Sequence, residues 1–136
     1  MESHFTNIKE ILIKEILEAE FIIHAAVAWV TDFDIIKALA RKLDEGLQVE
    51  LIINDDDRFA KRLRQFENFR KLGGRLFLYK VDSPSLMHNK FCIIDLNTVV
   101  TGSFNWSHSA STIHFENVVI ERHNFLFARN YAKEFA

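Results

Sequence analysis

The chain has 136 residues, of which 49% are hydrophobic and 26% are charged, with only 4 glycines and 1 proline. This composition excludes a disordered or low-complexity chain, and the length fits one folded domain. The formal net charge of −2 argues against a broad basic surface that wraps duplex nucleic acid, but it leaves room for a small local anion site. The single cysteine, Cys92, cannot form an internal disulfide.

Targeting signals are not evident in the sequence. The N-terminus has no basic run followed by an apolar stretch, and no segment reaches the roughly 20 apolar residues that cross a bilayer. We therefore expect a cytoplasmic protein with neither a signal peptide nor a transmembrane segment.

Three elements are predicted in the first third of the chain. Residues 5–18 place apolar side chains at helical spacing among lysines and glutamates, which is typical of an amphipathic helix. Residues 21–30 form a nearly unbroken apolar run of strand length, as in a strand buried on both faces. Asp32 or Asp34 is expected to cap a helix over residues 35–43.

The middle of the chain continues the alternation of helix and strand. Residues 47–53 predict a second strand, and the polar stretch 54–57 precedes a helix expected over residues 59–72. A third strand is predicted over residues 75–79, followed by a turn at 83–85. This order favours an α/β fold: a single domain with a mixed, largely parallel sheet and helices on both faces.

The last third of the chain predicts an antiparallel pair of strands and a closing helix. The paired strands are expected over residues 90–95 and 98–104, joined by a tight turn at 96–97. A further strand is predicted over residues 115–121, and a helix over residues 125–135. One side of this helix is expected to carry its apolar residues: Phe125, Ala128, Ala132 and Phe135.

The stretch from residue 88 to residue 117 has the spacing of a phosphate site. His88 and Lys90 are two residues apart, so on a strand they face the same side, and an imidazole beside an ammonium group suits a phosphate. Ser103 and Asn105 are also two apart and present a hydroxyl and an amide to one edge of the sheet. Gly102 lets the chain turn closely at the strand end.

These residues form the pattern H-x-K-x4-D-x6-G-S-x-N, carried by the segments MHNKFCIID and TGSFNWS and followed by ENVVI. The pattern resembles the phospholipase D superfamily, and six specified positions at fixed spacing make it a selective signal. The resemblance implies one phospholipase D-like domain over residues 1–136. Because the motif is present once, it also implies a homodimer, as in the small endonuclease-like and cardiolipin hydrolase-like members.

The resemblance also implies a mechanism. His88 would attack phosphorus to form a phosphohistidine, while His88 of the partner subunit would protonate the leaving oxygen and then activate water. Two imidazoles that face one phosphate have coupled titrations, which fits this division of roles. Lys90 and Asn105 would hold the nonbridging oxygens. Glu116 would hydrogen-bond the imidazole and fix its tautomer, with Ser103 supporting the same site.

Two further motif positions are expected to support the site rather than to act in it. Asp95 lies five residues from Lys90, on the other face of an ideal strand, so we assign it a structural role, as we do Gly102. The resemblance implies neither a metal nor another cofactor, and the sequence has no Cys/His cluster with metal-ligand spacing.

Several other polar and aromatic residues have structural interpretations that compete with functional ones. For residues 55–57, a solvated loop with one carboxylate at a helix N-terminus fits better than a divalent-cation site. His24 is interpreted as a core histidine. Trp29 and Trp106 either stack on substrate or pack, and the sequence does not decide between these roles.

Two histidines, His108 and His114, follow the Gly-Ser-x-Asn turn and are candidates for lining the cleft.

The favoured interpretation is a metal-independent phosphodiesterase, an endonuclease-like homodimer that cleaves DNA or RNA, with single strands favoured. One alternative is a hydrolase of a phospholipid of the cardiolipin type. Against it, residues 5–18 mix glutamates with lysines and so lack the basic face of a membrane-binding helix. The other alternative is a non-catalytic module that binds nucleic acid or acts as a scaffold. The sequence leaves open the choice among DNA, RNA and phospholipid, and whether the chain is part of a longer protein.

Overall fold

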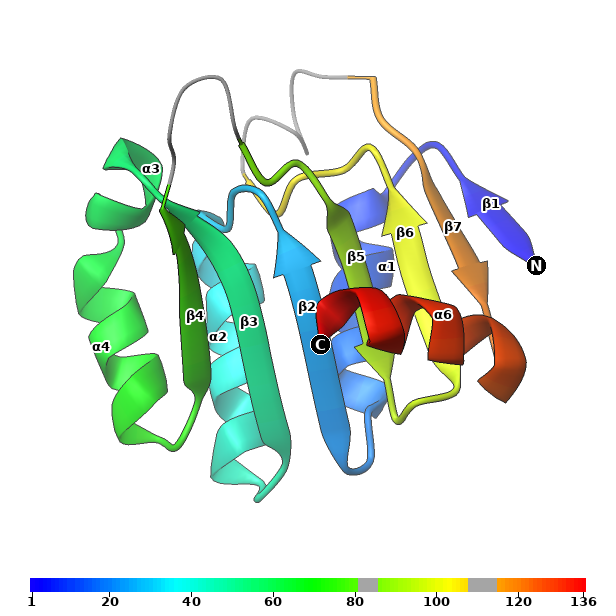
Figure 1. Cartoon of the computed structure of the whole chain (residues 1–136), viewed down its shortest axis with the longest axis horizontal. Coiled ribbons are helices and arrows are strands. Elements are labelled where there is room, and N and C mark those ends of the chain that lie inside the picture. The colour runs from blue at the N-terminus through cyan, green and yellow to red at the C-terminus, as the bar shows by residue number, and fades with distance from the viewer. Residues whose placement is uncertain (81–85, 108–114) are drawn as a thin grey trace.

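The computed structural model describes residues 1–80, 86–107 and 115–136. The predicted turn at 83–85 and both His108 and His114 lie outside these residues. The described part of the chain forms a seven-stranded sheet with the order β1-β7-β6-β5-β2-β3-β4 (Figure 1). The strands are β1 (Glu2–His4), β2 (Ile22–Val27), β3 (Gln48–Asp55), β4 (Arg75–Lys80), β5 (Lys90–Ile94), β6 (Thr98–Gly102) and β7 (Val118–Glu121).

The sheet is mixed, as predicted, but it is not largely parallel: two of the six pairings between its strands are parallel and four are antiparallel. Strands β2, β3 and β4 are parallel, whereas β5, β6, β7 and β1 join the sheet through antiparallel pairings. The predicted antiparallel pair β5–β6 is confirmed. Strand β1 was not predicted from the sequence, because this three-residue edge strand has no apolar alternation of its own.

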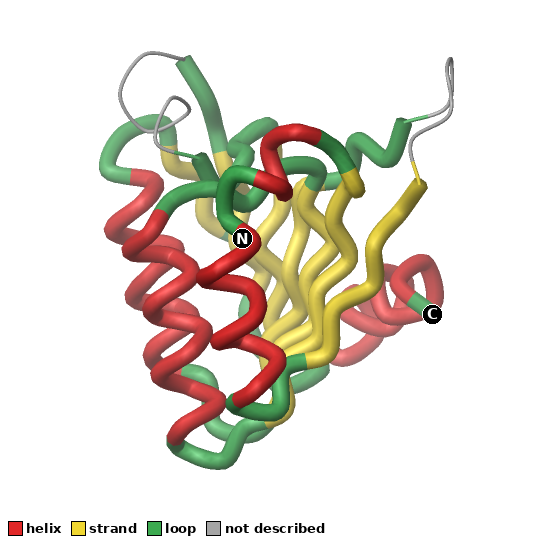
Figure 2. Tube along the Cα trace, turned by 90° about the vertical axis from the view of Figure 1, so that its left-hand side faces the viewer, coloured by secondary structure: helices red, strands yellow, loops and turns green. Residues whose placement is uncertain are grey.

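Helices cover both faces of the sheet, which confirms the predicted layers (Figure 2). One face is covered by α1, α2 and α4, and the other by α6. The helices are α1 (Ile8–Glu18), α2 (Phe33–Asp44), α3 (Asp57–Ala60), α4 (Leu63–Lys71) and α6 (Phe125–Phe135).

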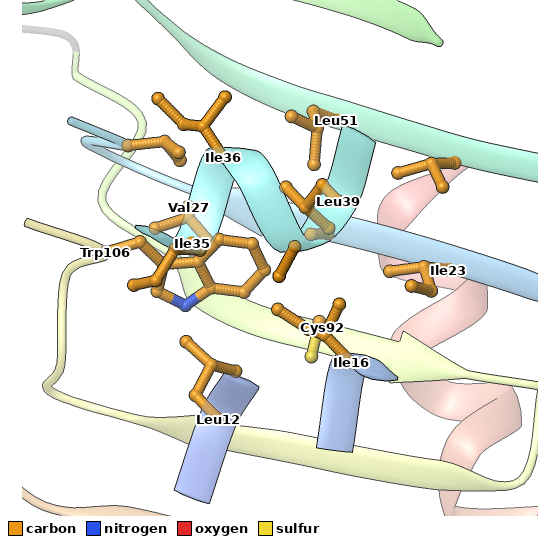
Figure 3. Packing of buried hydrophobic residues seen from close by; sticks show 14 of the residues in the cluster. Leu12, Ile16, Ile23, Val27, Ile35, Ile36, Leu39, Leu51, Cys92 and Trp106 are labelled. Carbon is orange, nitrogen blue, oxygen red and sulfur yellow. The ribbon is translucent and has the colours of Figure 1, made fainter. Parts of the chain in front are cut away.

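The main core lies between the sheet and helices α1 and α2 (Figure 3). Leu12 and Ile16 of α1 meet Ile35 and Leu39 of α2 above the sheet, and all four side chains are fully buried. Strand β2 explains why residues 21–30 read as an unbroken apolar run: alternate residues enter this core, and others face α6.

One predicted helix was wrong in its extent. The single helix expected over residues 59–72 is divided into α3 and α4, with Arg62 between them outside helical geometry. Phe59 and Phe66 are seven residues apart, a spacing that puts both on one side of a continuous helix and therefore hides the break. The closing helix α6 is confirmed, with Ala128 buried and Phe125, at its start, 59% exposed.

The turn between β5 and β6 is shifted by one residue from its predicted position. Asp95 and Leu96 both have left-handed backbone angles, with φ of 54° and 57°. The amide of Asn97 donates to the carbonyl of Ile94 at 3.1 Å and closes the turn. Positive φ at both central residues is typical of a type I′ turn. Because Ile94 pairs with Thr98, three residues separate the paired strand ends.

Candidate active site

The motif residues gather at one edge of the sheet. Val27 at the end of β2 pairs with Lys90 at the start of β5, and Gly102 at the end of β6 pairs with Val118 at the start of β7. Because β5 and β7 run antiparallel to β2 and β6, these four strand ends meet (Figure 1). His88 lies two residues before β5 at the same edge.

His88 and Lys90 are in direct contact, as their spacing predicted. The Lys90 ammonium nitrogen lies 3.1 Å from Nδ1 and 3.2 Å from Nε2 of the exposed His88 ring, and it donates to the His88 carbonyl at 2.9 Å. Both residues line a cavity of about 420 Å³ together with Gly102 and two residues of α6, Asn130 and Tyr131. The arrangement offers an imidazole and an ammonium group to one ligand.

The electrostatics of this cavity involve Lys90 and Glu116. Burial lowers the pKa of the Lys90 ammonium group, and the nearby Glu116 carboxylate partly opposes this shift. Glu116 is half-buried and lies two residues before β7. The predicted candidate Glu116 is therefore close enough to act on the charge of Lys90.

Ser103 joins the ends of β6 and β7. Its hydroxyl accepts a hydrogen bond from the amide of Asn117 at 3.0 Å and lies 3.2 Å from the Asn117 side-chain oxygen. Next to it, Gly102 allows a close approach of the two strands, because a Cβ at this position would overlap the carbonyl of Asn117 and lie 2.8 Å from Cα of Val118.

Asn105 and Trp106 follow this junction and differ in their surroundings. Asn105 is half-buried, and within the described part of the chain its side-chain oxygen is buried without a hydrogen-bond partner. Trp106 is 3% exposed and packs among the core residues (Figure 3). This burial resolves one open choice, because Trp106 is a packing residue and not a surface for stacking substrate.

Asp95 lies at the opposite edge of the sheet from His88. Its carboxylate accepts hydrogen bonds from three consecutive backbone amides, those of Glu20, Phe21 and Ile22, at 2.8–3.0 Å. These bonds attach the β5–β6 turn to the start of β2.

Asn54 was treated in the sequence as part of a polar loop, but the structure places it in β3 with 1% exposure. Its amide nitrogen donates to the carbonyl of Met87 at 2.8 Å and to that of Ala28 at 3.2 Å. In addition, the Ala28 amide donates to the carbonyl of Asn89 at 2.9 Å. The backbone is therefore held on both sides of His88.

The Trp29 side chain lies beside the His88 ring. The two rings meet edge to face, with centroids 5.9 Å apart and an interplanar angle of 83°. The indole N–H donates to Asp56 at 2.8 Å, and the Arg58 guanidinium carbon lies 4.2 Å from the centre of the indole. Sequence reasoning singled out Trp29 but missed its partners, which are the N-cap of α3 and a residue of its first turn, 27 and 29 positions further along.

In the acidic stretch 55–57, the predicted carboxylate at a helix N-terminus is confirmed, since Asp56 accepts from the amides of Arg58 and Phe59 and caps α3. The loop is shorter than predicted, because Asp55 ends β3 and Asp57 begins α3. Across residues 1–80, 86–107 and 115–136, no group of three or more His, Cys, Asp or Glu side chains is arranged to hold a metal ion.

His24 lies within the sheet, away from this edge. It is paired with Glu50 at 2.8 Å and stacked on Phe135 with ring centroids 4.7 Å apart. Burial lowers the pKa of His24, and Glu50 opposes this shift. These contacts support the structural interpretation of His24.

Comparison with known proteins identifies relatives along most of the chain. A mitochondrial cardiolipin hydrolase from Chlamydomonas reinhardtii is 32% identical over 91 residues, which cover 67% of this chain and 40% of the relative. A phospholipase D from Rickettsia prowazekii is 29% identical over 110 residues, which cover 80% of this chain and 52% of the relative. The chain thus spans about half or less of these two curated relatives.

Solved structures share the fold. The phospholipase D family member Nuc from Salmonella typhimurium aligns with a TM-score of 0.85 at 23% identity, covering 98% of this chain and 90% of Nuc. NucT from Helicobacter pylori aligns with a TM-score of 0.77 at 20% identity, covering 98% and 91%.

No helix in the described ranges is both long and apolar enough to cross a membrane. The family model described as "Cardiolipin synthase, PLD-like domain" matches residues 12–136. The fold, the motif spacing and this match together show that the chain belongs to the phospholipase D-like family.

Proposed function

We propose that the chain is a metal-independent phosphodiesterase that cleaves nucleic acid through a phosphohistidine intermediate on His88, as a homodimer. The observation that carries the proposal is the contact of Lys90 with the exposed His88 ring in a cavity at the edge of the sheet. An imidazole supplies a nucleophilic nitrogen, and the adjacent ammonium group attracts the phosphate anion.

The proposed reaction has two steps. First, a ring nitrogen of His88 forms a bond to phosphorus while the bond to the leaving oxygen breaks, and His88 of the partner subunit gives that oxygen a proton. Water then attacks phosphorus while the bond between phosphorus and His88 breaks, and one proton of the water passes to His88 of the partner subunit. This releases the phosphate monoester, leaves His88 neutral and restores the protonated imidazole of the partner subunit. Lys90 and Asn105 hold the nonbridging oxygens, where loss of one such donor typically costs about 3–4 kcal/mol in barrier height.

Supporting residues complete this proposal. Glu116 orients an imidazole and partly offsets the lowering of the Lys90 pKa by burial, and Ser103 fixes the strand ends that carry the site. We assign Asp95 and Gly102 structural roles, based on the three amides that Asp95 binds and on the close strand approach at Gly102.

A second candidate function is hydrolysis of a cardiolipin-type phospholipid, which the name of the Chlamydomonas relative favours. Both candidates share the chemistry at His88 and differ in what surrounds the phosphodiester. A third candidate is a module that binds nucleic acid without cleaving it, which would need no phosphohistidine.

The test is cleavage of labelled single-stranded DNA, duplex DNA and RNA in EDTA, beside hydrolysis of cardiolipin in vesicles. We expect single strands to be cleaved in EDTA and the His88→Ala variant to be inactive. Acid-quenched reactions should trap a phosphohistidine. Dependence on added magnesium, or activity in His88→Ala, would contradict the mechanism. Hydrolysis of cardiolipin alone would favour the second candidate. Binding of nucleic acid without a trapped phosphohistidine would favour the third.

Homodimerisation is tested by size-exclusion chromatography with light scattering, with activity measured across the same fractions. We expect cleavage to follow the dimer peak, because the second imidazole comes from the partner subunit. An active monomer would overturn the two-histidine scheme.

A further inference from the structure

We propose that Arg58, held over Trp29, binds a second phosphate of the substrate next to the phosphate at His88, so that a single-stranded polynucleotide is preferred over an isolated phosphodiester. This inference rests on the proposed function. We call Trp29, Asp56 and Arg58 the flanking site.

The flanking site adjoins the reacting group through one side chain. Trp29 contacts the His88 ring at a centroid distance of 5.9 Å and carries the Arg58 guanidinium carbon 4.2 Å from its ring centre. A single indole thus separates the nucleophile from an arginine. In the proposal, a ligand larger than one phosphate group extends from His88 across the indole to this arginine.

The flanking site is held in place by one carboxylate. One oxygen of Asp56 accepts from the indole N–H of Trp29 at 2.8 Å, and the other accepts from the backbone amides of Arg58 and Phe59 at 3.0 and 3.3 Å. The indole and the start of α3 are therefore fixed relative to each other. A pre-positioned arginine loses less conformational freedom when it binds an anion.

Arg58 is available for an anion. It is exposed, and among the described residues it forms no ion pair with a carboxylate. Stacking on an aromatic face leaves the N–H groups at the rim of the guanidinium free to bind phosphate in a bidentate manner.

The same arrangement occurs a second time nearby. The Arg62 guanidinium carbon lies 4.2 Å from the centre of the Phe33 ring, and its Nε donates to the carbonyl of Thr31 at 2.8 Å. Phe33 is 53% exposed. Trp29, by contrast, is half-buried. Trp29 and Phe33 come shortly after β2 in the chain. The two arginine–aromatic pairs therefore share the edge of the sheet that carries His88. Repeated cations beside aromatic rings fit a chain of phosphates and bases better than a lipid with apolar tails.

The experiment compares Arg58→Gln with the wild type on two substrates: a ten-residue oligothymidylate and bis(p-nitrophenyl) phosphate, which has a single phosphodiester. We expect kcat/KM for the oligonucleotide to fall about 10- to 100-fold, as for loss of a hydrogen bond to a charged group. Hydrolysis of bis(p-nitrophenyl) phosphate should stay within twofold. Arg70→Gln is the matched control, because this exposed arginine lies in the last turn of α4 and its loss changes net charge equally. It should affect neither substrate.

Equal losses on both substrates, or no loss on either, would overturn the proposal. A loss confined to cardiolipin, which has two phosphates, would overturn the assignment to a polynucleotide. Fluorescence anisotropy measures binding of the labelled oligonucleotide without requiring cleavage, so it tests this inference separately from the proposed function. If the wild type proves inactive, weaker binding by Arg58→Gln but not by Arg70→Gln supports the flanking site, and equal binding by all three proteins rejects it.

Discussion

At the scale of single residues, the charge of Lys90 links the environment of the site to its pH dependence. Burial lowers the pKa of Lys90 from its ordinary value of 10.5, and Glu116 opposes this shift. If Lys90 binds the phosphate as an ammonium group, as proposed, this form is lost as pH rises through the lowered pKa, and we expect activity to have an alkaline limit. Glu116→Gln removes the opposing charge, so we expect the alkaline limb of the kcat/KM profile to move to lower pH.

The measurement is a pH profile of oligonucleotide cleavage for the wild type and for this variant. Glu67→Gln, which removes an exposed carboxylate on α4, should leave the position of the limb unchanged. Lys90→Arg should lose the alkaline limb, because a guanidinium stays protonated throughout. If the alkaline limb of the kcat/KM profile lies at the same pH in the wild type and in Glu116→Gln, the group that titrates there is not Lys90.

A second prediction at this scale concerns Asn54, which holds the carbonyls of Met87 and Ala28. In Asn54→Ala both buried carbonyls lose a donor, so we expect a loss of about 1–3 kcal/mol in the free energy of unfolding. Cleavage should also slow, since the backbone before His88 is less well fixed. Denaturant unfolding and kcat measure both effects, with the exposed Asn68→Ala on α4 as control. Unchanged kcat in Asn54→Ala would show that Asn54 does not position His88.

The difference between these residues shows what the sequence can predict. His88 and Lys90 are two residues apart and face the same side of an extended strand, so their spacing alone indicates that they act together. Asn54 reaches the carbonyl of Met87 across 33 positions of the chain, and Trp29 reaches Asp56 across 27. Such contacts arise when strands and loops assemble at the sheet edge, so no local pattern predicts them.

At the scale of elements, Asp95 connects the β5–β6 turn with β2 through three backbone amides. Asp95→Ala leaves these amides without their acceptor, so we expect a loss of about 2–4 kcal/mol in the free energy of unfolding and a lower Tm. The folded variant should keep its kcat, since Asp95 lies at the opposite edge from His88. Thermal unfolding by circular dichroism, together with cleavage well below the Tm, checks this. A normal Tm with a reduced kcat would instead assign Asp95 to catalysis.

Most elements follow from apolar periodicity, and the exceptions have identifiable causes. Strands β2 to β6 and helices α1, α2 and α6 lie where the apolar patterns predicted them, within a few residues at their ends. The break between α3 and α4 comes from contacts of residues around it, since Arg62 donates to Thr31 and Asp56 caps the short α3. Strand β1 exists because β7 offers it a partner, which its own three residues do not indicate.

At the scale of the whole molecule, cationic side chains gather near His88 although the net charge is small. The edge with His88 carries Lys90 together with the two stacked arginines. Carboxylates lie at this edge too, among them Asp56, which caps α3, and Glu116 near Lys90. We therefore expect the attraction of an anion to be local and to come from these three cations.

These three cations predict a weak but measurable salt dependence of binding. If Lys90, Arg58 and Arg62 each bind one phosphate, the plot of log binding constant against log salt concentration should have a slope of about −2 per subunit, because each contact on a single strand contributes about −0.7. Arg58→Gln should reduce the steepness by about 0.7, whereas Arg70→Gln should not change it. Anisotropy titrations of a labelled single-stranded oligonucleotide at several salt concentrations measure these slopes. A slope near zero in the wild type would mean that the basic edge does not bind the strand, and a much steeper slope would require phosphate contacts beyond these three side chains.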